Sequence, residues 1–321
     1  MSVLYPVRLS GKYGYIDELG NLIIEPKYSQ ASLFRCGLAL VHIGTRCGFI
    51  NQNGDEVVQI VCDIAHPFYE NLGTAKFKGR WHCFSVLGES KFVIDVSFLD
   101  VFSLDRAAIA QGGKTDEYGG HFGGRWGYAD ENGQEVIPQK FDAADRYSEG
   151  LAAVQIANER GYIDRAGNFV IGPSENLKIT QPFTEGLAAV ASGDLRNLAW
   201  TYVNNTGKAH CVPQDCTWCD SFSEGMAAAR IGKNWSGNIG YLTRNGNFAI
   251  QPKFSEGDKF VGGIATIKEN SKCGYLQQNG TYLIEPHYDF AMRFVGNLAY
   301  VRENGAFKYI NRNDRVIFSC V

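Results

Sequence analysis

Two short segments of this 321-residue chain contain residue types whose spacing could support chemistry. The first, Gly113-Lys114-Thr115, resembles the end of a phosphate-binding loop. Such a loop needs a glycine five residues before Gly113, where this chain has Ala108, and a helix after the threonine. Further glycines follow instead of a helical pattern. We therefore reject a nucleotide site at this segment.

The second segment is Cys216-Thr217-Trp218-Cys219, with His210 and Cys211 close by. A pair of cysteines two residues apart suggests zinc binding or redox chemistry, but structural zinc sites usually need two such pairs and this chain has one. Free cysteine also serves as a small apolar core residue. The spacing alone leaves both interpretations open.

Other residue types that could act in catalysis do not form a recognisable set. The six histidines are widely spread and share no ligand spacing: His42, His66, His82, His121, His210 and His287. Neither a serine elbow nor a His-Glu-x-x-His pattern occurs. We predict that the chain is not an enzyme and has no catalytic, cofactor-binding or metal-binding residues.

Composition restricts the class of partner. The chain has 31 basic and 34 acidic residues, and a net charge of −3 disfavours binding to the nucleic-acid backbone. No run of about 18 apolar residues is present, so we expect no transmembrane helix and no membrane partner. Nine cysteines, an odd number, and no visible secretory signal favour a cytoplasmic protein without disulfides.

A repeat organises the chain. When the sequence is aligned on Gly14, equivalent positions recur at intervals of 34 to 45 residues, which defines nine units over residues 1–321 as a single array. The positions are Gly14, Gly48, His82, Gly127, Gly161, Thr201, Gly240, Gly274 and Lys308. The third unit, near residues 77–110, is degenerate.

Each unit has the same internal pattern. Two apolar stretches flank a turn that begins with Asp or Asn and ends with Gly, as in Asp17-Glu18-Leu19-Gly20, which predicts a β-hairpin. Proline often follows the second strand and is expected to end it; examples are Pro26, Pro138, Pro173, Pro252 and Pro286.

Next come large, small and large residues at intervals of three, as in Phe141, Ala144 and Tyr147, which predicts a tight or 3₁₀-like turn. Cys216 and Cys219 occupy the large and small positions of their unit, and Cys62 occupies the large position of another. This alignment favours core packing of these thiols over metal binding.

A third apolar stretch, often introduced by Ser/Thr-Glu-Gly, ends seven residues before the next reference position. It should pair with the next hairpin. The recurrent Asp17, Asp130 and Asp164 are best explained as turn formers. The recurrence of Glu149, Glu185 and Glu224 at one position predicts that they bond the backbone.

These patterns predict an all-β protein of nine three-stranded antiparallel units, stacked as a curved solenoid or a propeller-like array. Nine units exceed the usual number of propeller blades, which favours an open array.

The motifs Lys12-Tyr13-Gly14-Tyr15 and Arg125-Trp126-Gly127-Tyr128, with Pro-Lys-Tyr/Phe and Glu-Gly-Leu-Ala-Ala-Val, resemble bacterial WG (KWG) β-repeat proteins. The resemblance covers nearly the whole chain and is weakest at residues 77–124 and 191–238. It implies a non-catalytic recognition scaffold. Proteins of this kind recur beside toxin genes and can serve as immunity proteins, so a cognate toxin is the expected partner.

Three insertions interrupt the repeat, at residues 111–124, 192–197 and 232–237, all between a third strand and the next first strand. Loops on a rigid scaffold commonly carry binding residues, although a tolerated flexible insertion explains them equally well. The candidate partner interface comprises Tyr118, His121, Phe122 and Trp235. The predicted function is a non-enzymatic inhibitor that binds and occludes a toxin. The alternatives are a general protein- or peptide-binding scaffold and an uncharacterised enzyme.

Overall fold

A computed structural model describes residues 3–116, 120–232 and 237–320. Within these ranges the chain forms strands, turns and bends, and contains no helix. No helix in the described part is therefore long and apolar enough to cross a membrane. The chain divides into two compact units. Unit 1 is Met1–Ala157 with Ile163–Asn168, and unit 2 is Asn158–Tyr162 with Phe169–Val321.

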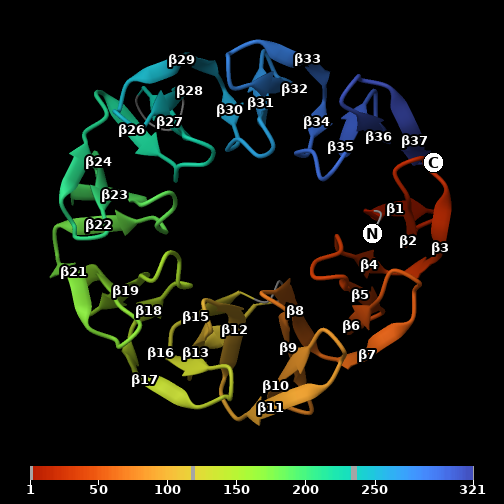
Figure 1. The fold of residues 1–321 in the computed structure, drawn as a ribbon, viewed down its shortest axis with the longest axis horizontal. Coiled ribbons are helices and arrows are strands. Elements are labelled where there is room, and N and C mark those ends of the chain that lie inside the picture. Colours follow the sequence, from red (N-terminus) through yellow and green to blue (C-terminus); the bar gives the residue numbers. More distant parts are fainter. Residues whose placement is uncertain (1–2, 117–119, 233–236, 321) are drawn as a thin grey trace. The chain divides into compact units, whose positions relative to one another are not determined.

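The described residues form nine antiparallel sheets whose strands follow one another along the chain (Figure 1). The first four sheets lie in unit 1. The first comprises β1 (Tyr5–Leu9), β2 (Lys12–Ile16) and β3 (Leu22–Tyr28), and the second comprises β4 (Gln30–Ala31), β5 (Ala39–Ile43), β6 (Arg46–Ile50) and β7 (Glu56–Cys62). The third comprises β8 (Ile64–Tyr69), β9 (Leu72–Phe77), β10 (Arg80–Ser85) and β11 (Ser90–Ile94), and the fourth comprises β12 (Phe98–Ser103), β13 (Arg106–Gln111), β16 (Arg125–Asp130) and β17 (Glu135–Phe141). A separate ribbon pairs β14 (Lys114–Thr115) with β15 (His121–Phe122).

The boundary between the units falls in the fifth sheet. This sheet comprises β18 (Ala143–Ala144), β19 (Ala152–Ile156), β20 (Glu159–Ile163) and β21 (Phe169–Ser174). The remaining sheets lie in unit 2. The sixth comprises β22 (Leu177–Thr180), β23 (Leu187–Asp194), β24 (Asn197–Asn204) and β25 (Ala209–Cys211), and the seventh comprises β26 (Cys216–Cys219), β27 (Met226–Ile231), β28 (Asn238–Thr243) and β29 (Phe248–Phe254). The eighth comprises β30 (Glu256–Gly257), β31 (Ile264–Glu269), β32 (Lys272–Gln277) and β33 (Tyr282–Tyr288), and the ninth comprises β34 (Phe290–Ala291), β35 (Leu298–Glu303), β36 (Ala306–Asn311) and β37 (Val316–Cys320).

The prediction of an all-β repeat protein is confirmed, whereas the prediction of three-stranded units is wrong. Eight of the nine sheets have four strands, and the first has three. The additional strand is the segment predicted as a 3₁₀-like turn, which instead pairs with the next strand, as Ala144 does with Val154. In four of the sheets, at β4, β18, β30 and β34, the additional strand has only two residues, which is too short for a sequence signature of its own. The preference for an open array stays a prediction.

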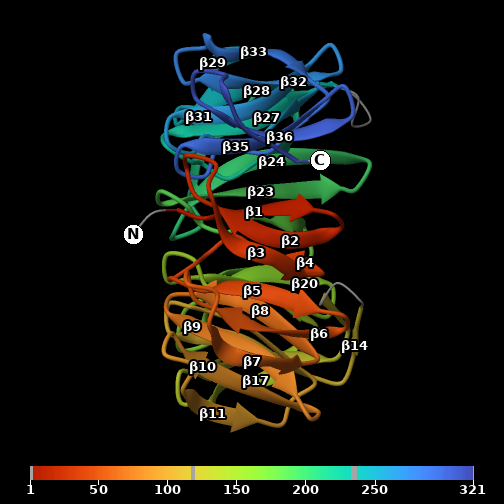
Figure 2. The ribbon, with the colours of Figure 1, turned by 90° about the vertical axis from the view of Figure 1, so that its right-hand side faces the viewer.

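The expected pairing of the third apolar stretch with the next hairpin is confirmed. Val7 pairs with Gly14 and Ile267 pairs with Gly274, each seven residues apart. Figure 2 shows the resulting strands β5, β6 and β7 lying side by side. The turn aspartates also act as predicted: Asp164 Oδ1 accepts the backbone N–H groups of Ala166 and Asn168, both at 2.9 Å.

A bulge in β33, the last strand of the β30–β33 sheet, explains why the reference position is a glycine and why a proline is found in the strand that faces it. Cys273 pairs with Tyr288 and Tyr275 with Ile284, so four residues of β33 span two residues of β32. Pro286 lies inside this bulge, on an edge strand where its missing N–H is not needed. The prediction that proline ends the strand is therefore wrong, because β33 continues to Tyr288.

Gly274 faces the bulge. A Cβ atom there would lie 2.7 Å from both the Ile284 carbonyl oxygen and the Pro286 nitrogen, closer than atoms in contact can approach. Where the reference position is His82 or Lys308, the two strands pair residue by residue at that position, His82 with Val93 and Lys308 with Ser319, and their register shifts only further along. Side chains are thus tolerated at this position where the bulge is absent.

The cores lie between neighbouring sheets and are fastened by polar groups at fixed repeat positions. Tyr241 and Tyr275 are buried, and each hydroxyl donates a 2.8 Å hydrogen bond to a carbonyl 17 residues later, in the next sheet. Glu224 has a positive φ of 54° and accepts the N–H groups of Gly262 at 2.6 Å and Gly263 at 2.8 Å. Glu185 accepts the N–H of Gly225 in the same way, at 3.1 Å. For these two glutamates the predicted backbone-bonding role is confirmed.

Candidate partner-binding surface

As predicted, the insertions fall in the same connection of each affected sheet. This connection joins the second strand of the sheet, which is the predicted third stretch, to the third strand, which is the predicted first strand of the next hairpin. The first lies between β13 and β16 and the third between β27 and β28. The second is not a separate loop, because its residues lengthen β23 and β24, whose pairing continues to Asp194 and Asn197.

Two of the four predicted interface residues are described by the structure, and they differ in role. His121 stacks on Phe98, with ring centroids 4.9 Å apart, and its nitrogens contact Thr115 Oγ1 and the Gly112 carbonyl oxygen, both at 2.9 Å. Burial lowers the pKa of His121. This histidine positions the β14–β15 ribbon. The Phe122 side chain is 65% exposed, so it offers an aromatic surface to a partner. Tyr118 and Trp235 lie outside the described residues.

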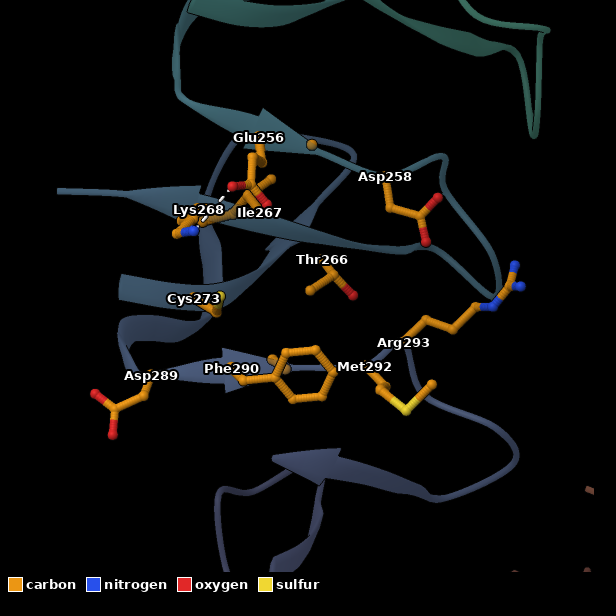
Figure 3. Close-up of a pocket in the computed structure, with 12 residues that line it drawn as sticks. Glu256, Asp258, Thr266, Ile267, Lys268, Cys273, Asp289, Phe290, Met292 and Arg293 are labelled. Atoms are coloured by element: carbon orange, nitrogen blue, oxygen red, sulfur yellow. Dashed lines mark hydrogen bonds and ion pairs between the residues drawn. The ribbon is translucent and has the colours of Figure 1, made fainter. Parts of the chain in front are cut away.

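Sequence reasoning did not identify a second surface, a cleft of about 490 Å³ in unit 2 between the β30–β33 and β34–β37 sheets (Figure 3). One wall carries Phe290 and Met292, alternate residues that follow one another along and just beyond β34. They are 40% and 52% exposed, although both are large and apolar. Only the three-dimensional pairing of the short first strands reveals this cleft.

Hydrogen bonds from both sheets fix the base of the cleft. The hydroxyl of buried Tyr275, from the β30–β33 sheet, donates to the Met292 carbonyl oxygen at 2.8 Å. The Met292 N–H donates to the backbone carbonyl oxygen of Tyr300, within its own sheet, also at 2.8 Å. Between the walls lies Thr266, whose Oγ1 is buried and without a hydrogen-bond partner in the described structure. The cleft is therefore a preformed shape rather than a gap between mobile loops.

Charged groups stand at both ends of the cleft. At one end Lys268 Nζ lies 2.8 Å from Glu256 Oε1, and this hydrogen bond raises the pKa of Lys268. Asp258 and Arg293 lie at the other end (Figure 3), and among the described residues neither has an ion-pair partner within 4.0 Å. The cleft thus combines an apolar wall with the carboxylate of Asp258, whose Oδ1 accepts the Lys259 N–H at 2.9 Å, and with the guanidinium of Arg293.

The residues considered for chemistry occupy structural places. Lys114 and Thr115 form a strand rather than the start of a helix. Cys62, Cys216 and Cys219 are buried, which confirms the predicted core positions. Across the described ranges no group of three or more His, Cys, Asp or Glu side chains is arranged to hold a metal ion.

Comparison with known proteins agrees with the repeat seen in the sheets. The profile of the family described as "WG containing repeat" matches seven segments that together exceed half of the chain: residues 13–44, 48–81, 126–159, 161–195, 200–235, 239–273 and 274–305. The chain belongs to the WG-repeat family. The unmatched residues 82–125 contain most of the degenerate third repeat and the first insertion. The WG-repeat fold suggests a protein-binding scaffold.

Solved structures show likeness of fold alone. A crystal structure of a eukaryotic initiation factor is 11% identical, with 99% of this chain and 96% of that chain covered and a TM-score of 0.51. The structure of apo AztD from Citrobacter koseri is also 11% identical, with 99% and 93% covered and a TM-score of 0.47. No curated protein matches the WG-repeat chain.

Proposed function

We propose that this WG-repeat protein is a non-enzymatic inhibitor, an immunity protein that binds a toxin in the bacterial cytoplasm and covers the surface that the toxin needs for its action. The observation that carries the proposal is the exposed pair Phe290 and Met292 in a cleft with a fixed base. The resemblance to proteins that recur beside toxin genes supplies the identity of the partner.

The chemistry of the cleft supports a protein ligand. Two exposed apolar side chains on one wall gain free energy by burial against an apolar side chain of a partner, at about 25 cal/mol per Å². Because the base is already hydrogen-bonded, binding orders few additional groups. Asp258 and Arg293 can pair with opposite charges on the partner and so fix its orientation. Exposed Phe122 is a second contact of the same kind, on unit 1.

The test uses a toxin encoded beside the gene for this protein, which the proposal predicts, purified as an inactive variant, and titration calorimetry. Replacing both Phe290 and Met292 with alanine should weaken binding by about thirtyfold or more, because truncating buried anchors commonly costs about 2 kcal/mol. Val316→Ala, an exposed apolar residue on β37, is the control and should bind like the wild type. Phe122→Ala, measured in parallel, tests the contribution of the β14–β15 ribbon.

Three outcomes distinguish the possibilities. Tight binding by the folded double variant, with loss in Phe122→Ala, would move the interface to the insertion. Tight binding by both would show that neither surface is the interface. Failure of the wild type to bind or neutralise the neighbouring toxin would refute the immunity role and favour a scaffold with another partner.

A further inference from the structure

The proposed function does not use the two thiols of β26. Cys216 pairs with Ile231 and Cys219 with Ala229, and a bulge lies between Cys216 and Trp218. In a regular strand, residues three apart point to opposite faces. Here the bulge restores a common face, since Cys216 and Cys219 are both buried while Thr217 between them is exposed. The two thiols lie close enough to shift each other's pKa.

A second cleft of unit 2, of about 540 Å³, gives access to one of these thiols. It is lined by Trp200, Val212, Asp215, Cys216 and Ile231 among others, and Cys219 is not part of its lining. Cys216 is 8% exposed and Cys219 is 0% exposed. Of the two cysteines, Cys216 is therefore the one that a small molecule in this cleft meets.

The electrostatics assign different roles to the two sulfurs. The hydrogen bond from Cys219 lowers the pKa of Cys216, whereas the same bond, together with burial, raises the pKa of Cys219. Cys216 is thus the better nucleophile, and Cys219 keeps its proton. Cys62 occupies the same repeat position as Cys216 but has Ala65 in place of the second thiol, and burial raises its pKa to about 11.

We propose that Cys216 and Cys219 form a dithiol site that reduces peroxide or a similar small oxidant entering this cleft, and that they close to an intrastrand disulfide. The Cys216 thiolate attacks one oxygen of the peroxide, the O–O bond breaks, and the leaving hydroxide takes up a proton to form water. Cys216 becomes a sulfenic acid. The Cys219 sulfur then attacks the Cys216 sulfur, the S–O bond breaks, and the oxygen leaves as a second water with the Cys219 proton. Two electrons pass from the dithiol to the peroxide, and a dithiol reductant restores the thiols.

The experiment uses the full chain with the exposed Cys36 and the partly exposed Cys320 replaced by serine. The native protein is treated with hydrogen peroxide, and disulfides are located by peptide mass spectrometry. We expect the loss of two thiols and a link between Cys216 and Cys219, reversed by dithiothreitol. With Cys219→Ala, dimedone should instead trap a sulfenic acid at Cys216.

Labelling rates provide the matched comparison. The lowered pKa of Cys216 and the raised pKa of Cys62 give Cys216 the larger fraction of thiolate, and the lower nucleophilicity of the weaker base offsets only part of this advantage. Iodoacetamide should therefore label Cys216, which is also the more exposed of the two, several times faster than Cys62 in the native protein. Equal rates, a link from Cys216 to Cys211, or retention of all thiols in peroxide would each overturn the proposal. Because the mapping is done with both thiols of β26 present, it does not depend on the folding of the Cys219 variant.

Discussion

The reference glycine of the repeat makes a prediction that the geometry of the bulge quantifies. In Gly274→Ala the new Cβ would meet three backbone atoms of β33: the Ile284 carbonyl oxygen at 2.7 Å, the Pro286 nitrogen at 2.7 Å and the Pro286 Cα at 2.8 Å. Backbone atoms cannot rotate away as a side chain can, so β33 must shift along its length. The ladder to β32 and the packing of Tyr288 would shift with it.

Overpacking of this kind costs roughly 1–3 kcal/mol. For a domain of this size, a loss of that magnitude corresponds to a decrease in Tm of roughly 2–12 °C. The matched control is Lys308→Ala in the next sheet, at the same repeat position, where β36 and β37 pair residue by residue and the register shift comes only after Tyr309. That change removes only a partly exposed ion pair with Glu303 at 2.8 Å, which contributes at most about 1 kcal/mol.

The assay is urea unfolding followed by circular dichroism, with thermal melts of the same samples. We expect the midpoint for Gly274→Ala to fall clearly below that for Lys308→Ala. If Gly274→Ala unfolds at the wild-type midpoint, or if the two variants lose the same stability, then close approach of the bulge does not explain the glycine.

The remaining predictions concern the turns and the fastening between sheets. Hydrogen bonds from the backbone N–H and side chain of Asn168, and from the N–H of Ala166, lower the pKa of Asp164 in the folded protein. The ionised carboxylate therefore stabilises the fold at pH values above the pKa that Asp164 has in the unfolded chain. This contribution is lost as the pH falls through the lower pKa of the folded state. The stability that Asp164→Asn loses relative to the wild type in thermal melts should therefore be smaller at pH 3 than at pH 7; a larger loss at pH 3 than at pH 7 would contradict this. Glu224→Ala should lose about 1 kcal/mol in urea unfolding, because the N–H groups of Gly262 and Gly263 lose their acceptor, whereas Glu224→Gln keeps an oxygen there and should lose less. Equal losses in the two variants would argue against the hydrogen-bonding role.

Much of the fold could be predicted because its signals are local. The turn at Asp164 is made by a side chain and N–H groups within four residues, so the sequence contains all of its partners. The pairing of Ile267 with Gly274 is equally local, since a tight hairpin joins the two strands. The short first strands could not be predicted in this way. A segment as brief as Ala143–Ala144 becomes a strand only because a longer neighbour offers it a ladder.

The candidate surfaces were predicted less completely, for a related reason. The sequence identified the insertion and its aromatic residues, but the burial of His121 depends on Phe98, 23 residues earlier in the chain. The cleft at Phe290 and Met292 had no signal, because it is formed by two sheets together and neither sheet contains it alone.

The sequence by itself determined the all-β class, the repeat period, the positions of the turns and the burial of Cys62, Cys216 and Cys219, since each follows from residue types at short, repeated spacings. The tertiary structure alone decided the additional first strand of each four-stranded sheet, the bulge that accommodates Pro286, and the exposure of Phe290 and Met292. It also decided that Cys216 and Cys219 share one face of β26. These features arise where different strands or sheets pack against one another. The free energy of this packing depends on both segments, so it cannot be predicted from the sequence of either segment alone.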